Sequence, residues 1–191
     1  MTNKEKIEEI EYHVEQIMNI LGITETPSTT GTPSRVAKMY VNEVFKHVNN
    51  EGIDELVKQM TTFPLEGSSS EMIIVKDIEF NSMCEHHFMP FSGKIAVGYV
   101  PKGRIMGLSK IPRVVKFFSK KPQLQERLCQ EIASFIFNSL DCSSIIVYCY
   151  DTKHTCVSNR GIEACCDTDT VYSENVSGEL RNEFFTRVKG C

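Results

Sequence analysis

The chain has 191 residues and a net charge of −4 at pH 7, and 41% of its residues are hydrophobic. This length suits one domain with a full core and a small appended segment. The acidic balance gives no overall positive field that would attract nucleic acid or an anionic membrane surface. Eight cysteines and a charged start without an apolar signal segment predict a reduced, cytoplasmic protein. No apolar run approaches the roughly 18 to 20 residues that span a bilayer.

The first third of the chain is predicted to be helical. Apolar residues at helical spacing predict three helices, over residues 4–22, 33–45 and 53–60. The stretch 24–34, rich in Thr, Ser, Pro and Gly, is predicted as a loop. Together these residues form a predicted N-terminal helical segment, residues 1–65. His13 and His47 lie in this segment and have no assigned role.

The remaining residues, 66–191, are predicted as a second unit built on a sheet. After a loop at 67–70, β-branched and aromatic runs predict strands at 72–80, at 93–100 and from 144 onward. Further helices are expected over 109–118 with Ser109 as the cap, over 122–140 with Pro122 at its start, and over 179–189. The order strand, strand, two helices, strand, strand predicts an α+β fold, an antiparallel sheet with helices on one face.

Two short clusters of Cys and His predict a metal site. Cys84, His86 and His87 form the first cluster, and His154 and Cys156 form the second. Thiolate and imidazole together suit zinc. Cys84 and His87 are three residues apart, so a bend must bring them onto one ion. His154 and Cys156 are two apart at the end of a predicted strand, which should place both on one face.

Three protein ligands would leave a fourth position open, as in a catalytic rather than a structural zinc site. If Cys84, His87 and Cys156 hold the metal, His86 and His154 remain beside it as candidate proton-transfer groups. Two other interpretations are compatible with the same residues. They could be ordinary core cysteines and histidines, or a closed, four-ligand structural site in a non-catalytic interaction module.

Five motifs follow one another in the order seen in the GTP cyclohydrolase I family, which the chain resembles from Thr32 to Gly161. They are Thr32-Pro33-Ser34-Arg35-Val36-Ala37-Lys38-Met39, Cys84-Glu85-His86-His87, Gly107-Leu108-Ser109-Lys110-Ile111, Gln123-Leu124-Gln125-Glu126-Arg127-Leu128, and His154-Thr155-Cys156 with Arg160-Gly161. The resemblance implies that residues 66–191 are a catalytic domain with the tunnelling fold, whose sheets assemble into a multi-subunit barrel. It also implies a homodecamer of two pentamers with active sites at subunit junctions, so an isolated monomer should be inactive.

The reaction implied by the resemblance is zinc-dependent hydrolysis of GTP to formate and 7,8-dihydroneopterin triphosphate. This is the first step of tetrahydrofolate, other pterin or deazapurine synthesis. The family's roles map onto the metal ligands Cys84, His87 and Cys156, the catalytic residues His86 and His154, the guanine contacts Glu126 and Gln125, and the phosphate contacts Ser109, Lys110, Arg113, Arg160 and, from a neighbouring subunit, Arg35.

Residues 162–170 depart from the Thr- and Ser-rich strand that the family commonly has there. Cys165 and Cys166 in this stretch are interpreted as buried or oxidisable thiols rather than metal ligands. Three lysines without a family role are expected to be solvated helix charges: Lys116, Lys120 and Lys121. An alternative function is that of the nitrile reductase of the same fold, which acts on a deazapurine with a nucleophilic Cys and NADPH. That enzyme has no use for the cluster of His154 and Cys156.

Overall fold

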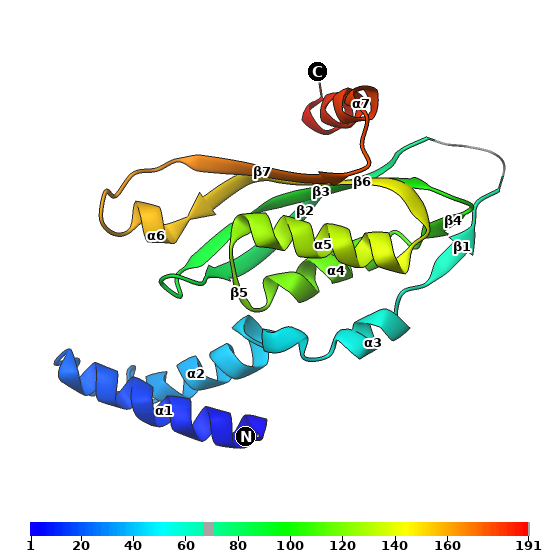
Figure 1. The fold of residues 1–191 in the computed structure, drawn as a ribbon. Coiled ribbons are helices and arrows are strands. Elements are labelled where there is room, and N and C mark those ends of the chain that lie inside the picture. The colour runs from blue at the N-terminus through cyan, green and yellow to red at the C-terminus, as the bar shows by residue number, and fades with distance from the viewer. Residues whose placement is uncertain (67–70, 191) are drawn as a thin grey trace.

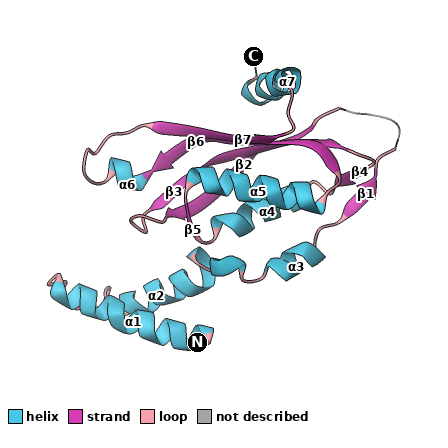
Figure 2. Ribbon diagram, in the orientation of Figure 1, coloured by secondary structure: helices cyan, strands magenta, loops and turns pink. Residues whose placement is uncertain are grey.

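The computed structural model describes residues 1–66 and 71–190 (Figures 1 and 2), so the predicted loop at 67–70 lies outside the described residues. In chain order its elements are α1 (Asn3–Ile20), α2 (Thr32–Met39), the π-helical turn η1 (Tyr40–Val44), the 3-10 turn η2 (Val48–Asn50), α3 (Ile53–Lys58), β1 (Thr62–Pro64), β2 (Ile73–Cys84), β3 (Pro90–Pro101), β4 (Arg104–Met106), α4 (Lys110–Ser119), β5 (Pro122–Gln123), α5 (Gln125–Ser139), β6 (Cys142–His154), α6 (Thr155–Ser158), β7 (Asp167–Glu174) and α7 (Gly178–Lys189).

The central sheet has five strands in the order β5-β2-β3-β6-β7. All neighbouring pairs are antiparallel except β2 with β5, which is parallel. A separate two-stranded ribbon joins β1 to β4. The predicted α+β fold with an antiparallel sheet is therefore confirmed.

Both faces of the sheet are covered, each by a different part of the chain (Figure 1). The helices α4 and α5 cover one face, and the main core between them and the sheet includes Ile95, Val97, Val114, Leu128, Ile132 and Val147. On the opposite face Phe184 of α7 is fully buried against residues such as Ala96, Ile146 and Tyr148. The prediction of helices on one face thus holds for α4 and α5, while α7 lies on the other face.

A β-bulge in β6 decides which way the end of that strand faces. The bulge lies between Cys149 and Thr152, and Asp151 within it has a φ of 50°. Cys149 and Thr152 are three residues apart, yet both are buried, with Sγ 3.2 Å from Oγ1. Because the extra residue shifts the alternation, Thr152 and His154 turn toward α5 while Lys153 is exposed.

One predicted helix start is wrong, and one predicted cap lacks its side-chain hydrogen bond. Pro122 does not open a helix, because Pro122 and Gln123 form the short strand β5 beside Met83 and Cys84, and α5 begins at Gln125. Ser109 occupies the position before α4 but makes no capping hydrogen bond with its side chain, since its own backbone is already helical at φ −68° and ψ −12°.

Lys121 is not the solvated charge that was predicted. It is 8% exposed, and its Nζ lies 2.8 Å from Glu131 Oε1 and 2.7 Å from Asn50 Oδ1. A lysine at this depth needs such a carboxylate, because an unpaired buried charge is costly. Lys116 is exposed, as predicted, and Lys120 is partly exposed.

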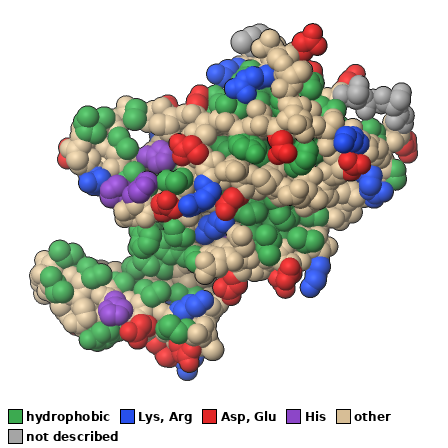
Figure 3. All heavy atoms as spheres, in the orientation of Figure 1, with side chains coloured by type: hydrophobic (Ala, Val, Ile, Leu, Met, Phe, Trp, Pro, Cys, Tyr) green, Lys and Arg blue, Asp and Glu red, His purple; other side chains and the backbone are tan. Residues whose placement is uncertain are grey.

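The N-terminal helices extend away from the sheet (Figure 1). A capping box between Thr2 and Glu5 starts α1, but none of its residues is buried. Ile17 is 55% exposed and Ile20 is 83% exposed, so the apolar stripe of this amphipathic helix remains partly uncovered. Figure 3 shows hydrophobic side chains at the surface of this part of the molecule. None of the helices in the described ranges combines the length and apolar character needed to cross a membrane.

We expect Gly98→Ala to lower the free energy of unfolding by about 1–3 kcal/mol. A Cβ at Gly98 in β3 would lie 2.7 Å from Phe184 Cδ2 and 2.9 Å from Met72 Sδ, so α7 would have to shift. The matched control is Gly178→Ala, because a Cβ there meets nothing within 4 Å, and it should stay within about 0.5 kcal/mol of the parent. Chemical denaturation at fixed protein concentration measures both. Equal stability of the two variants would contradict the packing of α7 on β3.

Candidate metal centre

The first cluster lies on a tight bend between β2 and β3. The amide of Phe88 donates to Cys84 O at 2.9 Å, and the amide of Cys84 donates to Met89 O at 2.9 Å. Phe88 has a φ of 50°, in the left-handed region that lets the chain reverse here. The predicted bend between Cys84 and His87 is therefore confirmed.

The second cluster reaches the site differently from the prediction. The strand β6 ends at His154, and Thr155 begins the short helix α6, which carries Cys156. Strand alternation therefore does not relate His154 to Cys156, and the prediction that it does is wrong. The hydroxyl of Thr155 donates to Pro90 O, which fastens the start of α6 to the start of β3.

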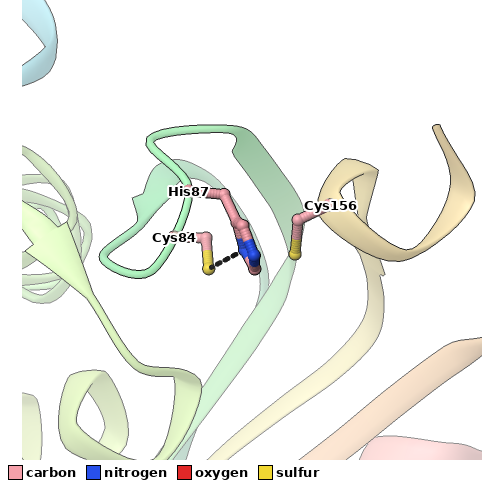
Figure 4. Close-up of side chains that lie close together, drawn as sticks. All are labelled: Cys84, His87 and Cys156. Atoms are coloured by element: carbon pink, nitrogen blue, oxygen red, sulfur yellow. Dashed lines mark hydrogen bonds between the residues drawn. The ribbon is translucent and has the colours of Figure 1, made fainter. Parts of the chain in front are cut away.

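Three donor atoms converge where these segments meet. One ligand atom each from Cys84, His87 and Cys156 lie within 4.8 Å of one another, and Figure 4 shows the three side chains pointing toward one another. Around a tetrahedral zinc the corresponding separations are about 3.5–3.8 Å, given bonds near 2.3 Å to sulfur and 2.0 Å to nitrogen. The donors would need to approach by at most about 1 Å, and less for the 4.0 Å between Cys84 Sγ and His87 Nδ1.

The chemistry of this donor set suits a soft, tetrahedral cation. The metal-ligand group found in the described ranges has three members, which leaves a fourth coordination position for water or a substrate. Burial and the adjacent Cys84 sulfur raise the pKa of the Cys156 thiol. A bound cation would reverse that effect, because it stabilises thiolate.

His154 lies beside the cluster in a fixed orientation. Its ring stacks on Phe91 with centroids 4.6 Å apart and planes inclined by 5°. Its Nε2 lies 3.0 Å from Oε1 of Gln125, at the start of α5. Burial lowers the pKa of His154, and the nearby Glu126 carboxylate opposes part of that effect. A half-buried imidazole held in this way can transfer a proton at one defined nitrogen.

Two more predicted residues lie at the cluster. His86 is exposed, and its Nδ1 is 3.6 Å from Cys84 Sγ. Arg160, predicted as a phosphate contact, donates from Nη1 to Nε2 of His87 at 2.8 Å. Histidine side chains gather at this end of the sheet, near α6, in Figure 3. Nε2 of His87 accepts this bond, while Nδ1 of the same ring lies 4.0 Å from Cys84 Sγ.

The two predicted guanine contacts differ in exposure. The carboxylate of Glu126 is exposed at the start of α5. Gln125 is 5% exposed, and its amide bonds to His154 and to Thr168 of β7 rather than pointing into open space. In this structure Gln125 therefore contacts a proposed catalytic side chain.

The remaining predicted phosphate contacts do not reach the cluster within one chain. The ten residues of α4 span about 15 Å. Its last residue leads, through Lys120 and Lys121, to β5 beside Cys84, so Ser109 and Lys110 lie at its far end. In Figure 1 α6 and β4 lie at opposite ends of the sheet.

The two remaining arginines have other partners. Arg113 donates to Gln59 Oε1 at 3.1 Å. Arg35 in α2 donates to Ser28 O at 3.0 Å and to Thr32 Oγ1 at 2.9 Å. Neither guanidinium is therefore directed at the metal cluster of its own chain.

Several residues at the site were missed from the sequence. Phe91 has no signature of its own, because an aromatic residue in a strand is usually core. Thr168 lies in the atypical 162–170 stretch and bonds to Gln125 at 2.7 Å. Cys165 and Cys166 in the same stretch are exposed, so the interpretation as buried thiols is wrong and only that as oxidisable thiols stays open.

Comparison with known proteins gives consistent matches over nearly the whole chain. A family model described as GTP cyclohydrolase I matches residues 10–189. The protein named GTP cyclohydrolase 1 from Vibrio cholerae is 41% identical over 84% of this chain and 72% of its own length. Its namesake from Photobacterium profundum is 37% identical over 99% of this chain and 87% of its own length. The protein of the same name from Flavobacterium johnsoniae is 39% identical over 91% of this chain and 76% of its own length.

A solved structure, the archaeosine synthase QueF-Like in its apo form, matches with a TM-score of 0.46 and 16% identity. The match covers 58% of this chain and 99% of that one. A likeness this distant has no bearing on function.

Proposed function

The chain belongs to the GTP cyclohydrolase I family of hydrolases, and we propose that it hydrolyses GTP to formate and 7,8-dihydroneopterin triphosphate with zinc as its cofactor. The observation that carries this proposal is the convergence of Cys84, His87 and Cys156 from the bend and α6, with His154 beside them. The product would enter tetrahydrofolate synthesis or a related pterin or deazapurine route.

Cys84, His87 and Cys156 would hold the metal and leave its fourth position open. Zinc in this position would act as a Lewis acid and make a water molecule nucleophilic near neutral pH. The chain's own contribution is to place C8 of the guanine ring beside the cluster and to move protons there. His86, exposed next to Cys84, is proposed to assist proton transfer at the ribose.

The hydrogen bonds around Gln125 indicate which nitrogen of His154 is free to react. Gln125 Nε2 donates to Thr168 O at 3.3 Å, so the other end of its amide, Oε1, is the acceptor. That oxygen accepts from Thr168 Oγ1 at 2.7 Å and from His154 Nε2 at 3.0 Å. Nε2 of His154 therefore carries a hydrogen, and Nδ1 is the atom proposed to exchange a proton with the purine.

Recognition of GTP requires an acceptor for the guanine edge and cations for the triphosphate. The exposed carboxylate of Glu126 is proposed to accept from N1 and the amino group of guanine. Arg160 is proposed to bind phosphate from the metal side of the site. Ser109, Lys110, Arg113 and Arg35 would complete the phosphate contacts.

The position of α4 supports a site shared between subunits. Ser109 and Lys110 lie about 15 Å along α4 from the end that adjoins the cluster. One GTP can meet both groups if they come from different copies of the chain. We therefore propose a homo-oligomer, a decamer by analogy with the family. The exposed Ile17 and Ile20 of α1 offer further apolar surface for a second copy to cover.

The zinc-loaded chain should release formate and a pterin in equal amounts when incubated with GTP. Formate assay and pterin fluorescence after oxidation measure this. Cys84→Ser should lower both bound zinc and turnover by about 100-fold or more, because it removes a thiolate ligand. Cys165→Ser makes the same chemical change outside the cluster and should alter neither. No turnover at full metal loading would contradict the proposal, and metal-independent oxidation of NADPH by an added deazapurine nitrile would favour the reductase.

Thr168→Val should lower kcat by about tenfold with little change in KM, because Gln125 Oε1 would lose the hydroxyl that orients it toward His154 and only the bond from Gln125 Nε2 to Thr168 O would remain. Thr168→Ser keeps the hydroxyl and should retain most of the parent kcat. Steady-state kinetics on both variants measure the difference. Equal kcat values for the Val and Ser variants, or a loss confined to KM, would show that Thr168 does not orient His154.

Mixing two inactive variants tests the shared site. Cys84→Ala and Lys110→Glu should each be inactive. The first damages the metal cluster and the second the phosphate contacts of α4, and under the proposal these two halves of one site come from different copies of the chain. Co-assembled in equal amounts, they should recover about one quarter of the parent activity, since that fraction of junctions has both halves intact. Cys84→Ala mixed with Cys156→Ala, which damages the same half twice, should recover none. Absence of recovery in the first mixture, with co-assembly verified, would place the whole site in one chain.

A further inference from the structure

The bend that carries Cys84 and His87 is tied to α5 by an arginine with no assigned role. Arg127 lies in the first turn of α5, and its Nη2 donates to Oε2 of Glu85, the residue inside the bend. The same guanidinium donates to Pro122 O at 2.9 Å and, from Nε, to Gln123 Oε1 at 3.0 Å. Three acceptors, one in the bend and two in β5, thus fix the plane of the guanidinium group.

Gln123 in β5, one of these acceptors, is itself immobilised. Gln123 is 1% exposed, and its Nε2 donates to Phe118 O at 2.9 Å and to Glu131 Oε2 at 2.6 Å. The other oxygen of Glu131 accepts from the buried Lys121 at 2.8 Å. Arg127 therefore connects the bend to a buried polar network rather than to a mobile surface side chain.

The bend needs such an anchor because much of it lies at the surface. His86, His87 and Phe88 are exposed, whereas Cys84 is buried at the end of β2. The amide of Glu85 also donates to Gln123 O at 3.2 Å, so main chain and side chain of this residue meet the same segment. Holding Glu85 on both sides restricts how far His87 can move from Cys84.

We infer that Arg127 is a positioning residue of the metal centre, which acts through Glu85 to hold the bend in the shape that brings Cys84 and His87 toward Cys156. The inference rests on the proposed function, since it concerns zinc held by these three residues. Glu85 and Arg127 are 31% and 38% exposed, so the ion pair itself contributes little to global stability. Its effect is instead expected in metal affinity, where an outer partner of a ligand segment typically matters 10–100-fold.

The test is a double-mutant cycle on zinc affinity. Arg127→Met and Glu85→Gln should each weaken zinc binding by about 10–100-fold, measured by competition with a chromophoric chelator. The zinc affinity of the double variant should lie within about twofold of that of the single variant with the lower affinity, because both changes break the same interaction. Arg104→Met is the matched control, since Arg104 donates to Thr62 in the β1–β4 ribbon, and its zinc affinity should equal that of the parent.

Hydrogen exchange on the metal-free chain gives a second measurement that does not depend on zinc. In Arg127→Met the amides of residues 84–88 should exchange faster than in the parent, while those of α4 should not change. If the Met variant does not fold, Arg127→Lys, which keeps the charge but not the planar fork, takes its place.

Zinc affinity within twofold of the parent in a folded Arg127 variant would overturn the inference, and so would additive losses in the double variant. A parent chain that binds no zinc would overturn the proposed metal function. In that case, unchanged amide exchange of residues 84–88 in Arg127→Met would also exclude a positioning role for Arg127. Faster exchange would show that Arg127 anchors the bend but would give it no part in metal binding.

Discussion

The register of β3 against β6 is the constraint on which the site depends. Phe91 pairs with His154 in this ladder, and that pairing places the start of β3, just after the bend, next to α6. A slip of one residue would turn His154 to the opposite face of the sheet, away from α5. The bulge before Thr152 has the same kind of influence, because it sets the face on which the strand ends. The approach of Cys156 to the bend, the stack of His154 on Phe91 and the contact of His154 to Gln125 all depend on these two features.

The cations that we propose as phosphate contacts lie in two separate places on the chain. The chain is acidic overall, so a triphosphate must be met by local groups of cations. Arg160 lies at the metal cluster, whereas Lys110 and Arg113 lie along α4 toward the other end of the sheet. Within the described ranges a single chain therefore presents two separate groups of the cations that we propose as phosphate contacts. The homo-oligomer proposed above would bring the two groups to one site.

Much of the fold could be predicted because it follows from local patterns. The helices α1, α3 and α7 lie close to their predicted ranges, since apolar spacing and caps are local signals. The bend at Cys84 was predictable because two ligands three residues apart cannot share one face of a strand. Residue type and spacing predicted the two clusters, and the resemblance to the family implied Cys84, His87 and Cys156 as the ligands within them.

The errors concern features that depend on distant partners. Pro122 lies in the strand β5 because it pairs with Met83 of β2. Lys121 can be buried because the carboxylate of Glu131 pairs with its ammonium group. Neither neighbour is apparent from local sequence. The placement of Cys156 on α6 depends on where β6 stops, and the partner of Gln125 lies 43 residues away in β7.

The long separation between the two halves of the cluster has a consequence for biogenesis. Cys84 and Cys156 are about 70 residues apart, and they meet only when β6 has added to β3. A nascent polypeptide that has been synthesised only as far as α5 contains Cys84 and His87 of the cluster but lacks Cys156. Such a fragment would hold a metal weakly, so the zinc that we propose would bind to the folded chain rather than guide its folding.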